Sequence, residues 1–233
     1  MQVGQNKIVL SPRISMLAEM LPDTESLADI GTDHGWLLSG LVAAGKIQRG
    51  IGVEIARGPY DRALANVSAQ GYQDRIEIRL GDGLAPLAVG ETTACAVAGM
   101  GGSTIISILE GRRQVAEGFA WLLLQPMTGA RRVRLYLQQN GWRISKEALA
   151  GDRGLIYELI LASRGEMAPL SPIEAEFGPL ILAEKPPILE AAVRQKLQSL
   201  RSIVAQLERS DSPASSEKRD ALLIQIREWE ALL

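Results

Sequence analysis

Residues 27–35 read LADIGTDHG, a short apolar run that ends on a carboxylate, a glycine and a turn. We expect a strand at Leu27–Ile30 and a helix from about Gly35 to Lys46. A strand that passes through a glycine turn into a helix opens many sheets that bind a ligand beyond the carboxyl ends of their strands. The rest of the chain is interpreted around this unit.

Apolar runs and helical patterns alternate along the chain as far as residue 140. The expected elements are strands at 50–55, 76–80, 94–98 and 119–124, and helices at 59–70, 103–111 and 129–140. Strands that are apolar throughout and separated by helices predict a parallel sheet covered on both faces.

The pattern changes after residue 140. Two strand-like runs, 142–150 and 154–162, are separated only by Gly151-Asp152-Arg153, which predicts an antiparallel hairpin. A parallel sheet that closes on a hairpin is unusual for dinucleotide-binding dehydrogenases and resembles class I methyltransferases. We therefore predict an α/β fold with a Rossmann-like sheet over residues 1–165.

Residues 166–233 are expected to form a linker and a C-terminal helical domain. Five prolines between 169 and 187 suggest the linker. Apolar residues then recur every three or four positions, and Ser212-Pro213 suits the start of a second helix. They are Leu189, Val193, Leu197, Leu200, Val204 and Leu207, followed by Leu222, Ile226, Trp229 and Leu233. We predict a helical hairpin resembling a short coiled coil.

Composition limits the class of protein. The chain has 233 residues, 46% of them hydrophobic and 22% charged, which is typical of a soluble globular protein. No run approaches the ~20 apolar residues that span a bilayer, and Met1–Lys7 lack the apolar core of a signal peptide. We therefore expect a cytoplasmic protein without a membrane partner. The single cysteine, Cys95, lies in an apolar run and is interpreted as a buried residue.

The net charge of −2 gives no overall attraction to nucleic acid, so an RNA partner would need a local basic patch. Arginines cluster at Arg112 and Arg113, and again at Arg131, Arg132 and Arg134. A solvated helix face explains each cluster, taken alone, at least as well as an RNA contact does.

The stretch at 27–35 suits S-adenosylmethionine, whose ammonium and sulfonium groups need a negative partner. Asp29 supplies that charge, Gly31 allows close approach of the backbone, and the following helix N-terminus can receive the carboxylate of the ligand. The dinucleotide motif G-x-G-x-x-G is absent, because Asp33 stands where its second glycine would be. A carboxylate there would repel a pyrophosphate, which disfavours NAD.

Further candidates follow the next three strands. Glu54 can hold both ribose hydroxyls, although NAD contains the same ribose. Asp82, beside Gly83, could accept from the adenine amino group or simply belong to a turn. The run Gly99-Met100-Gly101-Gly102 could pass close to a planar ligand, or could be only a tight turn. His34 is the only histidine of the chain, and no metal site is expected.

Motifs spread along the chain together resemble the bacterial TrmK family of tRNA methyltransferases. They are LSPR at 10–13, ADIGTDH at 28–34, Glu54 with Gly58-Pro59, Ala63 and Asn66, LGDGL at 80–84, AGMGG at 98–102, LQP at 124–126, and Tyr157-Glu158. The resemblance covers about residues 10–165 and extends to Phe177-Gly178-Pro179 and the helical pair. It implies S-adenosylmethionine as cofactor, tRNA as partner, and N1-methyladenosine at tRNA position 22 as product.

The resemblance also sharpens the expected roles. Asp33 is the candidate catalytic carboxylate, with His34 second, and the alternative for Asp33 is that it caps the following helix. The cofactor set is Asp29, Gly31, Glu54, Asp82, Gly83, Gly99 and Met100. The substrate set is Gly101, Gly102, Arg112, Arg113, Arg131, Arg132 and Arg134. Rival hypotheses are a methyltransferase for another RNA, a small molecule or a protein, an NAD-dependent oxidoreductase, and a non-enzymatic interaction module.

Overall fold

The computed structural model describes residues 9–208 and 212–233. Met1–Lys7, which were interpreted as lacking a signal peptide, lie outside these ranges. The chain divides into two compact units, Met1–Ser171 and Pro172–Leu233. In neither range does any helix have the length and apolar character needed to cross a membrane.

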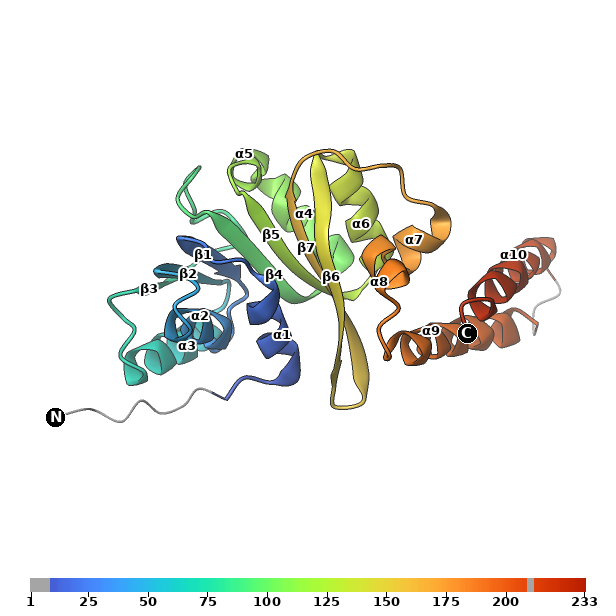
Figure 1. Ribbon diagram of the computed structural model, residues 1–233, viewed down its shortest axis with the longest axis horizontal. Coiled ribbons are helices and arrows are strands. Elements are labelled where there is room, and N and C mark those ends of the chain that lie inside the picture. Colours follow the sequence, from blue (N-terminus) through green and yellow to red (C-terminus); the bar gives the residue numbers. More distant parts are fainter. Residues whose placement is uncertain (1–8, 209–211) are drawn as a thin grey trace. The chain divides into compact units, whose positions relative to one another are not determined.

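Within the described residues, the strands of the first unit form one seven-stranded sheet in the order β3-β2-β1-β4-β5-β7-β6 (Figure 1). Strands β1 to β5 run parallel, whereas β7 is antiparallel to both β5 and β6. The bounds are β1 Ser26–Ile30, β2 Arg49–Glu54, β3 Ile76–Leu80, β4 Ala94–Gly101, β5 Trp121–Thr128, β6 Trp142–Asp152 and β7 Leu155–Arg164. The predicted Rossmann-like sheet with a closing hairpin is confirmed.

The strand order reverses between β1 and β4, because the chain builds outward from β1 to β3 and then returns to the other side of β1. In open α/β sheets a crevice forms at such a reversal, outside the carboxyl ends of the strands. Asp29 and Gly31 lie at this point, and Gly99 lies beside them on β4.

Helices cover both faces of the sheet. Their bounds are α1 Pro12–Met20, α2 Trp36–Ala43, α3 Arg57–Ala69, α4 Gly102–Gly111, α5 Arg113–Glu117 and α6 Ala130–Gln139. Alternate strand residues such as Leu27, Ala96 and Leu123 share one core with α1, α2 and α3. Cys95 is fully buried, as expected, and burial raises the pKa of its thiol. Helix α1 was not among the expected elements, although Ser11 caps it and Pro12 starts it.

The second unit is helical. The expected linker contains α7 Pro172–Phe177 and α8 Pro179–Glu184, so two of its five prolines begin helices. The predicted helical hairpin is confirmed as α9 Leu189–Leu207 and α10 Pro213–Glu230, and Ser212 caps α10. Its apolar seam includes the buried residues Val193, Leu197, Val204, Ile226 and Trp229.

The prediction that Arg134 contacts a phosphate is wrong. Its side chain is 0% exposed and points from α6 to two glutamates of the hairpin. Nε lies 2.7 Å from Glu147 Oε1, and Nη2 lies 2.7 Å from Glu158 Oε2. The arginine therefore ties α6 to β6 and β7, because a buried cation requires compensating charges.

Arg134→Ala should lower the free energy of unfolding by about 3–5 kcal/mol, because it leaves buried carboxylates without their cation. Arg132→Ala is a matched control, since Arg132 is exposed on the same helix, and it should change stability by less than about 0.5 kcal/mol. Urea unfolding of both variants measures the difference. Equal stability of the two variants would contradict the anchoring role.

Candidate active site

The carboxyl ends of β1, β2 and β4 bring together residues that are distant in the sequence. Asp29 pairs in register with Gly52 on one side and Ala96 on the other. Just beyond the strand, the Gly31 N–H donates to Val53 O at 2.8 Å. The sequence-predicted residues Asp29, Gly31, Glu54 and Gly99 therefore share one edge of the sheet.

Asp29 is a buried carboxylate. Its residue is only 4% exposed, and its Oδ2 accepts a hydrogen bond from the Thr32 hydroxyl at 2.7 Å. Burial raises the pKa of Asp29 from 3.8 to about 6, with a smaller contribution from the negative charge of Glu54, and the Thr32 hydrogen bond opposes the rise. A cationic ligand at this position would compensate the charge.

Gly31 has a backbone conformation and surroundings that exclude a side chain. Its φ is +73°, and an added Cβ would lie 2.3 Å from Met100 Cε. Met100 follows β4's Gly99, whose φ is +75°. The Met100 side chain therefore packs against the bare Cα of Gly31, and the positive φ of Gly31 and Gly99 favours glycine at both positions.

Glu54 ends β2 with 7% of its surface exposed and accepts a hydrogen bond from the Asp33 backbone N–H. The next residue, Ile55, is 69% exposed, although it is a large apolar side chain. An apolar surface beside a carboxylate suits a nucleoside, whose base has a flat face and whose ribose has two donors. Ile55 was not among the predicted site residues, although its place directly after Glu54 could have indicated it.

Asp33 and His34 form a polar cluster with residues of α3. Asn66 Nδ2 lies 3.1 Å from His34 Nδ1, and because an amide nitrogen only donates, Nδ1 accepts and Nε2 carries the proton of the neutral ring. That Nε2 is 3.6 Å from Asp33 Oδ1, and Arg62 Nη2 is 3.7 Å from the same oxygen. The Asp33 carboxylate is thus exposed toward solvent with two donor groups behind it.

Asp33 does not cap the following helix. α2 begins at Trp36 with Gly35 as its N-cap and has no side-chain cap. Asp33 itself has φ of 53°, a left-handed conformation that aspartate tolerates better than most residues. The capping alternative is wrong, which leaves the carboxylate available to a ligand.

The other glycine candidates lie on either side of this cluster. Asp82 is exposed in the turn after β3, where its carbonyl accepts from Ala85 N–H at 2.9 Å and Gly83 has φ of 52°. Gly101 is the N-cap of α4. Gly102 is buried, and an added Cβ would lie 2.6 Å from Gly129 O, so tight packing between α4 and the end of β5 explains this glycine.

A second polar cluster, which the sequence analysis did not assemble, lies where β4 and β5 end. Arg13 of α1 donates from Nη1 to Gln125 Oε1 at 2.6 Å, and its guanidinium carbon lies 5.5 Å from the centre of the Tyr157 ring. The Gly99 N–H donates to the same Gln125 oxygen at 3.1 Å. All three side chains belong to motifs that resemble the TrmK family, but their contacts span 112 residues between Arg13 and Gln125.

The remaining predicted arginines are exposed. Arg112 donates to Ala85 O at 3.3 Å, Arg113 pairs with Glu117 at 2.8 Å, and Arg132 donates to the Ser103 hydroxyl at 3.1 Å. Arg131 is exposed at the start of α6. These four side chains can meet a phosphate, whereas the buried Arg134 cannot.

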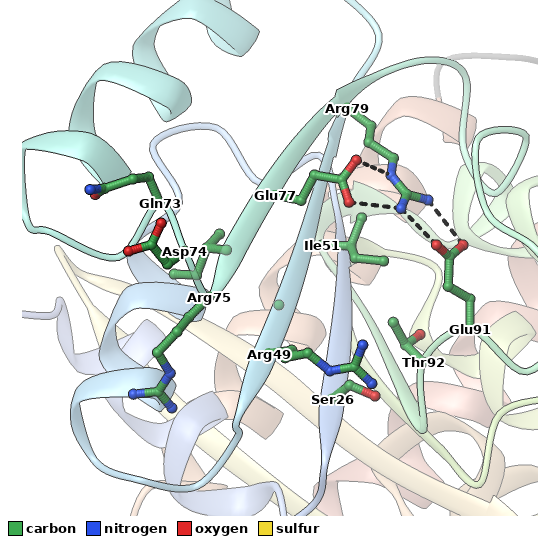
Figure 2. Close-up of a pocket in the computed structure, with 12 residues that line it drawn as sticks. Ser26, Arg49, Ile51, Gln73, Asp74, Arg75, Glu77, Arg79, Glu91 and Thr92 are labelled. Carbon is green, nitrogen blue, oxygen red and sulfur yellow. Dashed lines mark hydrogen bonds and ion pairs between the residues drawn. The ribbon is translucent and has the colours of Figure 1, made fainter.

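A cavity of about 190 Å³ lies at the opposite edge of the sheet (Figure 2). Its lining includes Ser26, Arg49 and Ile76, which are at or near the amino ends of their strands. The Arg79 side chain beside it is engaged by Glu77 at 2.8 Å and by Glu91 at 2.6 Å, as the dashed lines show. We do not assign this cavity to the active site, because ligands of open α/β sheets bind at the carboxyl edge.

Comparison with known proteins identifies the family. A family model described as TrmK, tRNA (adenine(22)-N(1))-methyltransferase, matches residues 27–230. The tRNA (adenine(22)-N(1))-methyltransferase of Bacillus subtilis (strain 168) is 31% identical over 219 residues, which are 92% of each chain. This chain belongs to the TrmK family. The resemblance noted in the sequence is thereby confirmed.

Solved structures agree with this assignment. The crystal structure of the B. subtilis m1A22 tRNA methyltransferase TrmK is similar with a TM-score of 0.87 and 29% identity, covering 97% of this chain and 99% of that chain. Sp1610 of Streptococcus pneumoniae, solved in complex with S-adenosyl-L-methionine, is similar with a TM-score of 0.83 and 30% identity. The match covers 97% of this chain and 100% of that chain. S-adenosylmethionine is the cofactor of this TrmK-family methyltransferase.

The residues at the carboxyl edge fit that cofactor. The buried Asp29 carboxylate suits the ammonium group of the cofactor. Gly31, with its positive φ, suits a close approach of the ligand to the backbone. Glu54, beside the exposed Ile55, suits the nucleoside. In residues 9–208 and 212–233 no three His, Cys, Asp or Glu side chains gather as metal ligands would.

Cofactor binding should strengthen as the pH rises from 5 to 7. Asp29 must be ionised to face an ammonium group, and its pKa of about 6 leaves roughly a tenth of it ionised at pH 5. We expect the Kd for S-adenosylhomocysteine, measured by calorimetry, to fall about tenfold over this interval, because an α-amino group with pKa near 7.7–8.0 stays protonated. Asp29→Asn should bind more weakly and without this pH dependence. The same slope in the variant would contradict the assignment.

Proposed function

We propose that this chain transfers a methyl group to N1 of adenine 22 in tRNA. The observation that carries the proposal is the buried Asp29 carboxylate beside Gly31 and Gly99, at the point where the strand order reverses. S-adenosylmethionine supplies an electrophilic methyl group on a sulfonium. Family membership supports the tRNA substrate and the position of the methyl group.

We assign the parts of the cofactor to successive strand ends. Asp82 and Gly83 follow β3, Glu54 and Ile55 follow β2, and Asp29 and Gly31 follow β1. Neighbouring strands lie about 5 Å apart, so these ends form a row long enough for an adenine, a ribose and an amino-acid group in that order. The adenine would then lie against Ile55, the ribose hydroxyls would donate to Glu54, and the ammonium would face Asp29.

The methyl acceptor would lie beyond Gly99 and Met100. Adenine N1 is on the Watson–Crick edge, so the base must be unpaired or swung out of a helix before its lone pair can reach the methyl carbon. Positioning supplies most of the rate, because the reaction is a single displacement. As the new C–N bond forms and the C–S bond breaks, the positive charge passes from sulfur to the adenine.

Asp33 is placed to stabilise that charge. Its side chain is exposed, and His34 Nε2 and Arg62 Nη2 lie within 3.7 Å of its Oδ1. A carboxylate near the exocyclic amine would stabilise the developing adeninium and could accept its proton. His34, held by Asn66, acts in this proposal as the group that orients Asp33.

The phosphates of the tRNA would contact the exposed Arg112, Arg113, Arg131 and Arg132, and contacts of this kind weaken as salt rises. The helical unit formed by α9 and α10 could add further surface. Because tRNA is the substrate, we place the reaction in the cytoplasm.

Asp33→Asn should lower kcat by about 10²- to 10⁴-fold while changing the Kd for S-adenosylmethionine less than about threefold. The reason is that the amide keeps the size of the side chain but loses the charge that the product adenine needs. Single-turnover methylation and calorimetry measure the two quantities. Parallel losses of turnover and cofactor affinity would assign Asp33 to cofactor binding instead.

The substrate assignment is tested with unmodified tRNA transcripts and labelled S-adenosylmethionine. A transcript with adenine at position 22 should accept one methyl group, recovered as N1-methyladenosine. The same transcript with guanine at position 22 should accept none. Equal labelling of both transcripts, or labelling only of a small molecule or a protein, would favour the alternative methyltransferase activities.

A further inference from the structure

Arg13 is held in a fixed place by a buried amide. Gln125, from β5, is 0% exposed, and its Oε1 accepts from Arg13 Nη1 at 2.6 Å and from the Gly99 N–H at 3.1 Å. An amide oxygen has two lone pairs, and both are used here. The oxygen therefore links α1 to the end of β4 and orients the guanidinium.

In the part of the chain that the structure describes, the rest of that guanidinium meets no hydrogen-bond acceptor. Among residues 9–208 and 212–233, Gln125 Oε1 is the sole acceptor within hydrogen-bond distance of the Arg13 side chain, so Nε and Nη2 keep their N–H groups for a ligand. The Tyr157 ring, 5.5 Å from the guanidinium carbon, restricts its position further. An arginine presents five N–H donors in a rigid plane, and such a fork fits a carboxylate.

The position of Arg13 relates it to Asp29. Arg13 Nη1 is 3.8 Å from the point where a Cβ of Gly99 would be, so the guanidinium lies over backbone that carries no side chain. Gly99 lies in the last part of β4, and β4 pairs with β1, the strand that carries Asp29. The charge of Arg13 is close enough to act on the Asp29 carboxyl, lowering its pKa against the dominant effect of burial. A positive and a negative side chain thus flank the same strand ends.

We propose that Arg13 binds the α-carboxylate of S-adenosylmethionine while Asp29 faces the ammonium on the same carbon atom, with Gln125 as the positioning residue. The proposal rests on the cofactor assignment above and adds its missing counter-charge. An amino-acid group is a zwitterion, so its receptor needs two opposite charges a few ångströms apart. Arg13 and Asp29 supply such a pair, and the backbone amides at the start of α2 carry no full charge.

A phosphate of the tRNA is the other anion that Arg13 could bind. Methylation at N1 gives the target base a positive charge, and a guanidinium close to that base would oppose the charge. A cofactor carboxylate on the guanidinium removes this conflict, because it neutralises Arg13 before the base is methylated. The structure therefore favours the cofactor.

Decarboxylated S-adenosylmethionine, which keeps the ammonium and sulfonium but lacks the carboxylate, separates the two anions. The Kd of S-adenosylmethionine should rise about 10- to 100-fold in Arg13→Ala, as expected for loss of charge-assisted hydrogen bonds. The Kd of the decarboxylated compound should change less than about threefold. Calorimetry on the full chain gives both values without requiring turnover.

Two further variants sharpen the test. Arg49→Ala removes the same charge from the opposite edge of the sheet, where Arg49 pairs with Glu25, and should leave both affinities unchanged. Gln125→Met keeps the side-chain length but loses the acceptor, and should weaken binding of S-adenosylmethionine by about 3- to 10-fold while sparing the decarboxylated compound.

Three other outcomes would overturn the proposal, each for a different reason. Equal weakening of both compounds in Arg13→Ala would mean that the arginine only supports the shape of the site. Unchanged cofactor affinity with weaker tRNA binding would assign Arg13 to the RNA. If the unaltered chain bound neither compound, the cofactor assignment itself would fail. A chain that binds S-adenosylmethionine as expected but does not methylate tRNA would leave the Arg13 assignment intact and reject only the proposed function.

Discussion

The proposed cofactor site depends on one carboxylate that the fold buries where the strand order reverses. Asp29 is nearly inaccessible, and the only hydrogen bond to its side chain among the described residues comes from the Thr32 hydroxyl. A pKa of about 6, compared with 3.8, means that ionised Asp29 opposes folding by about 3 kcal/mol near neutral pH. That cost falls as the pH drops toward 4, because the protonated carboxyl tolerates burial. In the binding mode that we propose, the ammonium group of the cofactor would offset the same cost.

The rest of the first unit keeps that carboxylate between its partners. The sheet places Glu54 on one side of Asp29 and Gly99 on the other, and α1 brings Arg13 over the end of β4. Two neighbouring residues of the closing hairpin, Tyr157 and Glu158, contact helices that pack against the sheet. Glu158 is fixed by the buried Arg134, and the neighbouring Tyr157 lies against Arg13. A helix on one face of the sheet thus helps to position a side chain that approaches from the other.

Much of the fold could be predicted from the sequence because local patterns specify it. Continuous apolar strands, the glycine turn after Ile30 and the short Gly151-Asp152-Arg153 connection each indicate one structure, and the helical pair follows from its apolar spacing. Prolines misled the interpretation of residues 166–187, because a proline that begins a helix looks the same in sequence as one that ends it. The helix α1 was overlooked for the same reason.

The site was predictable only in part, because some of its contacts join distant segments. Asp29 and Glu54 each end a strand, and that rule predicts their neighbourhood from sequence. Arg134 belonged to a run of arginines, yet it lies on the side of α6 that also carries the buried Val133 and Leu137. Only the three-dimensional structure shows that Arg134 forms ion pairs with Glu147 and Glu158. The contact between Arg13 and Gln125 likewise depends on how α1 packs against the sheet, which no local pattern specifies.

The most direct test of this account is a ¹³C NMR titration of the Asp29 carboxyl group, with Asp29→Asn used to assign its signal. In the free chain the titration should have its midpoint near pH 6. With saturating S-adenosylhomocysteine, the ammonium beside the carboxylate should move the midpoint below about pH 4. An Asp29 midpoint that does not move when the ligand binds would contradict the central claim.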